Sequence, residues 1–175
     1  MIHVKEPPVP VHPGSSNASR PQDIARLCQE RGVRFTPLRR IAYEVLLAAG
    51  GPASAYDLQR ALELRLGRRV SPPTVYRALD FLLQQGFIRR IETRNAFVPS
   101  AHPDDRHSGV FFLCTCCGTT VEVDVGALEA VLARDAAARG FQIGRRIVEL
   151  QGTCADCLSS AVQTAPAGRT RPTKI

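Results

Sequence analysis

The sequence contains no apolar run approaching the roughly 18 to 20 residues that a membrane-spanning helix needs. Its N-terminus is rich in Pro and lacks the apolar core of a secretory signal peptide. We therefore expect a cytoplasmic protein with no membrane partner. Because the cytoplasm is reducing, the six cysteines are not expected to form structural disulfides, and clustered thiols indicate metal binding instead.

The motifs of common enzyme classes are also missing. The sequence shows no nucleophile paired with a base, no Gly-rich phosphate-binding loop and no His-Glu-x-x-His metal motif. A metal- or thiol-dependent enzyme is therefore the least favoured class, and we predict no small-molecule substrate. With 44% apolar residues, the 175-residue chain is still able to bury a core, as one domain or two small ones.

Positive charge is concentrated in the first half of the chain. Between residues 20 and 98, 14 Arg against 7 Asp or Glu give a net charge of +7, whereas between 99 and 158, 5 Arg against 8 acids give −3. A basic first half favours a polyanion partner, since neutralising phosphates releases counterions. The alternative is a solvated Arg-rich surface.

Both ends of the chain have the composition of disordered tails. Residues 1–18 combine several Pro with Ser and Asn, and residues 161–175 are rich in Thr, Pro and basic side chains. Neither stretch has enough apolar surface to offset the entropy cost of ordering. We predict a disordered tail over 1–18 and a disordered basic tail over 161–175.

Four short helices and a hairpin are predicted over residues 19–98. N-cap residues, Pro at the first helical position and a closing Gly place the helices at about 21–31 (cap Ser19, stop Gly32), from Thr36-Pro37 to Gly50, from Ser54 to Gly67 with Asp57 completing a capping box, and from Ser71-Pro72 to Gly86. The turn residues Thr93-Arg94-Asn95 then separate two strand-like segments. Helices followed by a hairpin are typical of a winged helix-turn-helix.

The remaining ordered part is predicted to be a small α/β unit. Residues 99–109 are polar and contain Pro and Gly, which is typical of a hinge. Strands are expected at 110–113, 121–125 and 146–150, with a helix from about Leu128 to Gly140, in a domain spanning 110–160. The expected fold class is therefore α+β.

The fourth predicted helix has a face suited to reading DNA. On a helical wheel, Val75, Leu79, Leu82 and Leu83 share one arc, and Thr74, Tyr76 and Arg77 lie outside it. An Arg can donate two hydrogen bonds to guanine, and Thr or Tyr can contact phosphate or base methyls. Phe81 falls on the polar side, which the wheel does not explain. The alternative is an ordinary amphipathic helix with a hydrated face.

Two Cys-x-x-Cys pairs, Cys114/Cys117 and Cys154/Cys157, lie in the second half of the chain. Each pair can supply two of the four tetrahedral ligands of a closed zinc site. Thiol redox chemistry is the alternative, but the βαβ context that it requires is not evident. We interpret Cys28 as a packing residue and Cys116 as a third, extra thiol beside the first pair.

Several motifs together resemble the ferric uptake regulator family of dimeric, metal-responsive repressors. They are Gly32-Val-Arg-Phe-Thr-Pro-Leu-Arg39, Ala55-Tyr-Asp-Leu58, Thr74-Val-Tyr-Arg-Ala-Leu-Asp80, Gln85-Gly-Phe-Ile88 and Leu113-Cys-Thr-Cys-Cys-Gly118, and His107-Ser-Gly-Val-Phe-Phe-Leu-Cys114 is most similar to the zinc uptake regulator branch. The resemblance spans roughly residues 20 to 158. It implies a winged-helix head, an α/β dimerisation domain and binding of the homodimer to AT-rich palindromic DNA operators when metal is bound.

The resemblance also assigns roles to particular residues. The DNA contacts that it implies are Tyr56, Tyr76 and Arg77, together with Thr74 and Arg39, and Cys114, Cys117, Cys154 and Cys157 match the family's structural zinc site. For a second, regulatory zinc, His107 and Glu122 stand at ligand positions, whereas Arg89 and Ser100 replace two usual ligands. We expect His102, or the carboxylates Asp104 and Asp105, to complete that site.

The sequence therefore predicts a zinc-responsive repressor of metal-uptake genes that binds DNA as a dimer. One alternative is a regulator of the same family that responds to iron, manganese or peroxide. Another is a zinc-ribbon interaction module that binds DNA without sequence preference.

Overall fold

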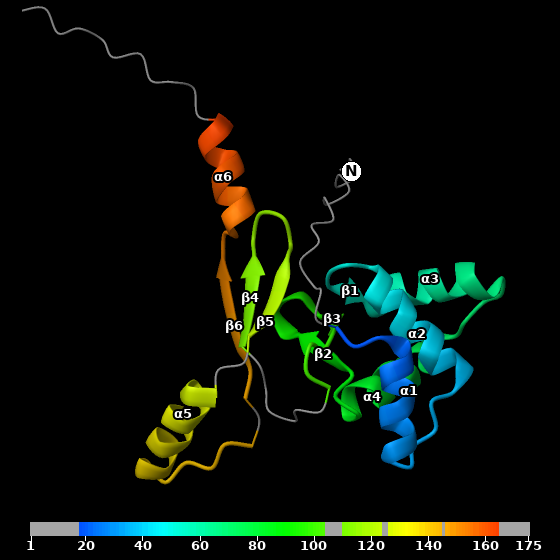
Figure 1. The fold of residues 1–175 in the computed structure, drawn as a ribbon, viewed down its shortest axis with the longest axis horizontal. Helices are drawn as coiled ribbons and strands as arrows, with labels where there is room; N and C mark the ends of the chain where they lie inside the picture. The colour runs from blue at the N-terminus through cyan, green and yellow to red at the C-terminus, as the bar shows by residue number, and fades with distance from the viewer. Residues whose placement is uncertain (1–17, 104–109, 124–125, 145, 165–175) are drawn as a thin grey trace, which may run out of the picture.

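The computed structural model describes residues 18–103, 110–123, 126–144 and 146–164. We call residues 18–103 the head and residues 110–164 the body. The head packs four helices against a small sheet, and the body consists of a second sheet with one helix at either end (Figure 1). The predicted α+β class is confirmed. Among the described residues, no helix has the length and apolar character that crossing a membrane requires.

The head contains the helices α1 (Pro21–Glu30), α2 (Pro37–Ala48), α3 (Ala55–Leu66) and α4 (Pro72–Gln84). Two of their predicted caps are confirmed. The Thr36 hydroxyl accepts a hydrogen bond from the Arg39 N–H, and Ser54 and Asp57 satisfy each other's backbone N–H groups at the start of α3. Gly67 ends α3 with a positive φ of 64°, a conformation that glycine adopts without strain.

The predicted cap of α1 is wrong. The N-cap residue is Arg20, not Ser19, and the Asp23 carboxylate accepts the Arg20 N–H. An acidic residue in the first turn can cap the helix from inside it, so no Ser is needed at the N-cap. The Ser19 carbonyl instead accepts the hydroxyl of the buried Tyr43 at 2.7 Å, which fixes the entry to α1 on α2.

The sheet of the head has the order β1-β3-β2, with both pairs antiparallel. Its strands are β1 (Ala53–Ser54), β2 (Ile88–Ile91) and β3 (Ala96–Pro99). The predicted hairpin β2–β3 is confirmed, with a 3-10 turn at Glu92–Arg94 and Asn95 at a φ of 46°. The very short β1 was not predicted, since two residues carry no pattern.

The body sheet has the order β5-β4-β6, and β4 pairs antiparallel with β5 and parallel with β6. Its strands are β4 (Val110–Cys114), β5 (Thr120–Val123) and β6 (Val148–Gly152), and the helices of the body are α5 (Gly126–Ala138) and α6 (Ala155–Thr164).

Helix α6 was not predicted. It continues to Thr164, so the C-terminal tail predicted to begin at residue 161 was placed too early. Asp156 in its first turn favours the helix start. The predicted tail over 1–18, apart from Ala18, and residues 165–175 lie outside the described residues.

Head and body meet through a shared apolar cluster of Ile91 and Val98 from the hairpin with Phe111 and Leu113 from β4. The start of the predicted hinge is also bound to the head. The Ser100 N–H donates to the Phe87 carbonyl at 2.9 Å, and the Arg31 guanidinium donates to the Pro103 carbonyl at 2.9 Å. Residues 104–109, the rest of that hinge, lie outside the described residues.

Candidate metal centre and nucleic-acid interface

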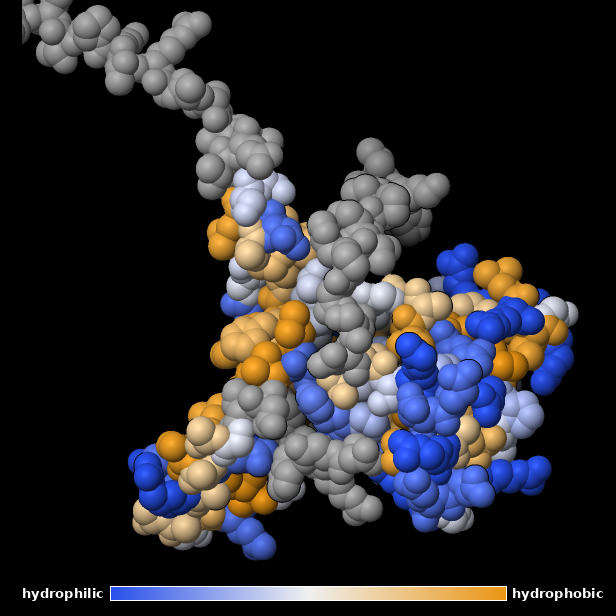
Figure 2. Space-filling model, in the orientation of Figure 1, coloured by the Kyte–Doolittle hydropathy of each residue, from blue (hydrophilic) through white to orange (hydrophobic). Residues whose placement is uncertain are grey.

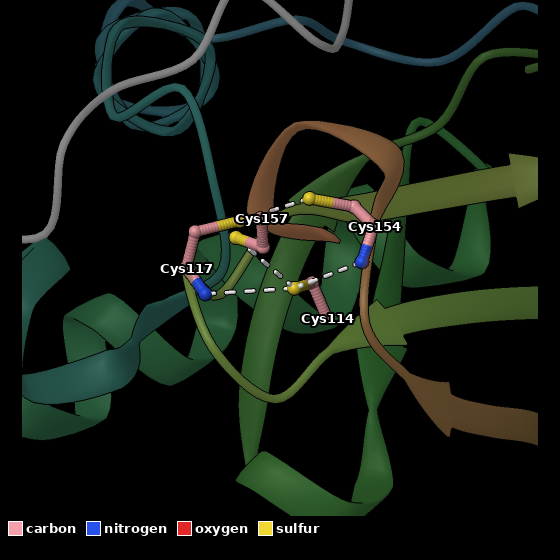
Figure 3. Close-up of side chains that lie close together, drawn as sticks. All are labelled: Cys114, Cys117, Cys154 and Cys157. Carbon is pink, nitrogen blue, oxygen red and sulfur yellow. Dashed lines mark hydrogen bonds between the residues drawn. The ribbon is translucent and has the colours of Figure 1, made fainter. Parts of the chain in front are cut away.

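The two Cys-x-x-Cys pairs meet at the edge of the body sheet, where β4 and β6 end side by side. Cys114 ends β4 and Cys117 lies on the turn that follows it, while Cys154 follows β6 and Cys157 lies in the first turn of α6 (Figure 3). The sulfurs of Cys114 and Cys157 are 3.9 Å apart and those of Cys117 and Cys154 are 3.6 Å apart. All four ligand atoms lie within 4.8 Å of one another. The predicted pairing of the two motifs in one site is thus present in the structure.

The distances among these sulfurs suit zinc. A tetrahedral site with Zn–S bonds of about 2.3 Å places its sulfurs roughly 3.8 Å apart, close to the observed separations. None of the four cysteines is in a disulfide. When bound, Zn²⁺ supplies a cross-link between two arms of the body: the end of β4 with its turn, and the segment that follows β6. Among the described residues this is also the one group of three or more His, Cys, Asp or Glu side chains placed to hold a metal.

The surroundings of the sulfurs favour the thiolate form at the first pair. The backbone N–H groups of Cys117 and Cys154 donate to the Cys114 sulfur at 3.5 and 3.3 Å and lower the pKa of Cys114 to about 6. Contact with the Thr119 hydroxyl lowers the pKa of Cys117. The neighbouring sulfurs, first that of Cys154, raise the pKa of Cys157. A cation is what allows all four thiols to ionise together.

The candidate DNA-reading residues lie on exposed parts of the head. Tyr76 and Arg77 project from α4 into solvent, with Tyr76 54% exposed, and Tyr56 at the start of α3 is 65% exposed. Val75, Leu79 and Leu82 are buried beneath them, as the wheel predicts. Helix α4 therefore presents a polar face while its apolar face holds it on the head. This accessibility is what base or phosphate contacts require.

Thr74 and Arg39 are less free than Tyr76 and Arg77. The hydroxyl of Thr74 is hydrogen-bonded to that of Ser71 at 2.8 Å. The Arg39 guanidinium lies over the ring of Phe81, 3.6 Å from its centroid, and donates to the Arg34 carbonyl. Phe81 is only 8% exposed, so the wheel placed it on the wrong side. A cation stacked on its open face explains why a Phe is stable there.

Sequence reasoning missed one basic residue beside these contacts. The Arg60 guanidinium lies 5.9 Å from the ring centroid of Tyr56, and both side chains are exposed. The signal was available, because residues four apart on a helix lie on the same face. Arg60 therefore joins Tyr56 as a candidate phosphate contact.

The predicted regulatory zinc site is only partly visible. His107, Asp104 and Asp105 lie outside the described residues, and the exposed His102 lines a cavity of about 280 Å³ between head and body together with Glu122. Glu122, however, is ion-paired with Arg89, with Nε and Oε1 3.3 Å apart and only 17% and 7% of the two side chains exposed.

The second oxygen of Glu122 is also engaged. The Ala101 N–H donates to Oε2 at 2.9 Å, and the hydroxyl of the fully buried Ser100 lies 3.4 Å away. The two residues that stand in place of usual ligands, Arg89 and Ser100, thus both bind the carboxylate that was predicted to bind metal. Within the described residues, a three-ligand regulatory site is not assembled.

One face of the body sheet is apolar and exposed. Phe112 on β4 is in register with Val121 on β5 and Leu150 on β6, and all three are 43–47% exposed. Helix α5 contributes no buried side chain. Hydrophobic surface is visible over α5 and over the sheet in Figure 2. We call Phe112, Val121 and Leu150 the sheet patch.

Comparison with known proteins places these features in one family. The model of the ferric uptake regulator family matches residues 30–151. The zinc uptake regulation protein of Escherichia coli (strain K12) is 37% identical over 135 residues, which cover 76% of this chain and 78% of that protein.

Solved structures agree with this match. A zinc uptake regulator complexed with zinc and DNA is 34% identical, with a TM-score of 0.77, and the match covers 82% of this chain and 99% of that one. The crystal structure of holo XcZur is 38% identical, with a TM-score of 0.72 and coverage of 79% and 96%. The chain belongs to the ferric uptake regulator family.

Proposed function

We propose that this protein is a zinc-responsive transcriptional repressor of metal-uptake genes that acts in the cytoplasm as a homodimer on palindromic operators. The observation that carries the proposal is the presence, in one chain, of the four-cysteine cluster and of a winged-helix head whose α4 exposes Tyr76 and Arg77. The similar proteins support zinc as the metal, since they are described as zinc uptake regulators and one is complexed with zinc and DNA.

In this proposal residues 19–98 read DNA. Arg77 donates to guanine in the major groove, Tyr76 contacts bases or phosphate next to it, and Tyr56, Thr74 and Arg39 bind the backbone. The net positive charge of the head adds a sequence-independent attraction to the phosphates. In a dimer the two heads must reach major-groove sites roughly 34 to 36 Å apart, so their relative placement decides affinity.

The body, residues 110–160, supplies the dimer contact. The sheet patch and the exposed Leu128 and Val131 of α5 offer apolar side chains to a partner, and contiguous exposed apolar side chains mark interaction surfaces. Covering them with a second copy removes apolar area from water and stabilises a unit that has little core of its own.

Zinc is proposed to have two roles. The four cysteines hold a permanent ion that joins β4 to β6. A second, regulatory ion is assigned to His102, His107 and Glu122 near the hinge 99–109, and Glu122 must release Arg89 to bind it. Closure of head on body in the metal-bound form then favours the DNA-binding dimer.

The test is a selection of bound sequences from a random DNA duplex pool with the zinc-loaded protein, followed by gel shifts with zinc, iron or manganese. We expect one AT-rich palindrome to be enriched and zinc to tighten its binding most. Arg77→Ala should weaken that binding by about 1 to 3 kcal/mol and relax the base preference. The exposed Arg26→Ala on α1 is the matched control. Salt-sensitive binding without sequence preference would instead support a zinc-ribbon interaction module.

A further inference from the structure

The turn at the tip of the head hairpin, Glu92–Arg94, is bound by the body on two sides. The Glu149 carboxylate on β6 accepts the N–H groups of Glu92 and Thr93 at 2.6 and 3.2 Å and the Thr93 hydroxyl at 2.5 Å. The Arg94 guanidinium donates to the backbone carbonyls of Cys114 and Gly118, each at 2.8 Å. We call Glu149 and Arg94 the tip clamp.

The two halves of the tip clamp rest on the two arms that carry the cysteines. Gly118 closes the turn that holds Cys114 and Cys117, and its N–H also donates to the Cys114 carbonyl at 3.1 Å. Glu149 lies on β6, the strand that leads to Cys154, and is in register with Phe111 on β4. A metal that draws the two arms together therefore also sets where Glu149 and these carbonyls stand relative to each other.

The geometry of Arg94 makes this contact sensitive to the shape of the cysteine turn. A guanidinium is planar and presents its N–H groups in a fixed fork, so two carbonyls must stand at one separation for both bonds to form. Here two different guanidinium nitrogens each reach a separate carbonyl. If the turn opens, at most one of these bonds can persist.

The Glu149 half of the clamp is equally specific. Burial raises the pKa of Glu149, but the Thr93 hydroxyl and the N–H groups of Glu92 and Thr93 outweigh it and hold the pKa below its usual value. The carboxylate is therefore ionised at neutral pH and accepts all three bonds. Just behind the turn, the fully buried Ile91 packs with Phe111 of the body, so the clamp closes over a shared apolar cluster.

We infer that Arg94 and Glu149 are positioning residues that couple the four-cysteine metal site to the placement of the DNA-binding head. The inference rests on the proposed function, in which the spacing of the two heads decides affinity. With the cysteine turn held by metal, the clamp fixes the hairpin on the body. With the turn released, the hairpin loses its anchor, although the head itself stays folded.

Coupling of this kind is reciprocal. If the metal favours the clamped hairpin, the clamped hairpin must favour the metal by the same factor. Loss of the clamp should therefore weaken zinc retention at the cysteines as well as DNA binding. A residue that merely touched DNA would not affect zinc.

The experiment uses the full-length, zinc-loaded protein and the variants Arg94→Ala, Arg94→Lys and Glu149→Gln. Arg90→Ala is the matched control, because Arg90 lies on β2 of the same hairpin and forms an ion pair with Glu92 and a hydrogen bond with Asn95, both within the hairpin. Zinc transfer to a chromogenic chelator reports on the metal site. Gel shifts on a duplex selected by the wild-type protein report on the head.

We expect Arg94→Ala and Glu149→Gln to bind zinc roughly 5-fold or more weakly in equilibrium competition with the chelator, and also to bind the duplex more weakly. Arg94→Lys keeps the charge but not the fork and should resemble Arg94→Ala, whereas Arg90→Ala should behave like wild type. Glu149→Gln keeps the side chain's size and removes no basic group from the head, so it tests the coupling even if Arg94→Ala fails to fold.

Two results would overturn the inference. If Arg94→Ala and Glu149→Gln retain zinc as well as Arg90→Ala does, the cysteine site is not coupled to the hairpin. Weaker DNA binding with unchanged zinc retention makes Arg94 a DNA contact instead. If the wild-type protein selects no duplex but the clamp variants still lose zinc more readily, the proposed function fails while the link between metal and hairpin stands.

Discussion

Head and body reach their folds by different means. The head buries a continuous apolar core whose fully buried members include Ile24, Tyr43, Leu46, Leu58, Leu62, Leu82 and Phe87. The described part of the body buries only Val110, Phe111, Leu113, Cys114 and Cys117 among its apolar residues, and two of these are metal-ligand candidates. A small unit with so little core needs other stabilisation. We therefore expect the head to fold alone, and the body to depend on metal, on the head and on a partner copy.

Removal of one cysteine should separate the stabilities of head and body most strongly. Cys154→Ser leaves three thiols, so the body loses an ion whose binding contributes about 10 to 16 kcal/mol in zinc-finger peptides. We expect the body to lose protection in hydrogen exchange while α1–α4 keep theirs. Cys116→Ser, at the exposed extra thiol, is the control and should retain zinc. Equal loss of protection in both units would show that the head is not autonomous.

A large-to-small change in the head core should have the opposite pattern. Phe87 is fully buried, so Phe87→Ala should lower the free energy of unfolding of the head by about 3 to 5 kcal/mol. Chemical denaturation gives the free energy, and zinc content should stay at the wild-type value. Phe141→Ala, at a ring that is 68% exposed in the body, is the matched control. Loss of zinc by Phe87→Ala while the head is still folded would show that the cysteine site depends on the packing of the head core.

The dependence of the body on a second copy can be tested at the sheet patch. Leu150→Glu places a carboxylate opposite apolar side chains and should cost roughly 2 kcal/mol or more in dimerisation. Light scattering during gel filtration should then report monomers at concentrations where wild type is dimeric. Leu64→Glu, at an 84% exposed leucine on α3, should leave the dimer intact. Dimers of Leu150→Glu as stable as wild type would place the interface elsewhere.

The smallest expected effect concerns the ion pair at the junction. Arg89→Ala removes the cation paired with Glu122. Because desolvation offsets most of the attraction in a largely buried pair, we expect a modest effect, with a second zinc ion binding roughly 5-fold more tightly, or about 1 kcal/mol. Calorimetric titration of the zinc-loaded protein with further zinc measures the affinity for this second ion, and Arg90→Ala is the control. Weaker or unchanged zinc binding would remove Glu122 from the regulatory site and leave Arg89 as the cation that closes the junction.

Features set by neighbouring residues could be predicted from the sequence. The caps of α2 and α3 depend on Thr36 and on the Ser54–Asp57 pair, each within three positions. The cysteine cluster could be predicted although its pairs are far apart, because the spacing within each pair already defines a bidentate ligand. The hairpin followed from turn residues between two apolar segments.

Contacts between distant residues could not be predicted. Glu149 and Glu92 are 57 positions apart, and no periodicity links a carboxylate on one strand to the turn of another. The burial of Phe81 depends on Arg39 from a different helix, which a single-helix wheel cannot include. Arg89 and Ser100 could be seen to replace ligands, but only the fold shows that both turn to Glu122.

The attachment of Pro103 to the head has a kinetic consequence. With its carbonyl held by Arg31, the chain leaves the head at Pro103 and enters the body at Val110. So brief a tether keeps the hairpin and its docking surface at a high effective concentration, of the order of millimolar. We therefore expect an undocked hairpin to be recaptured by its own body rather than by a neighbouring molecule.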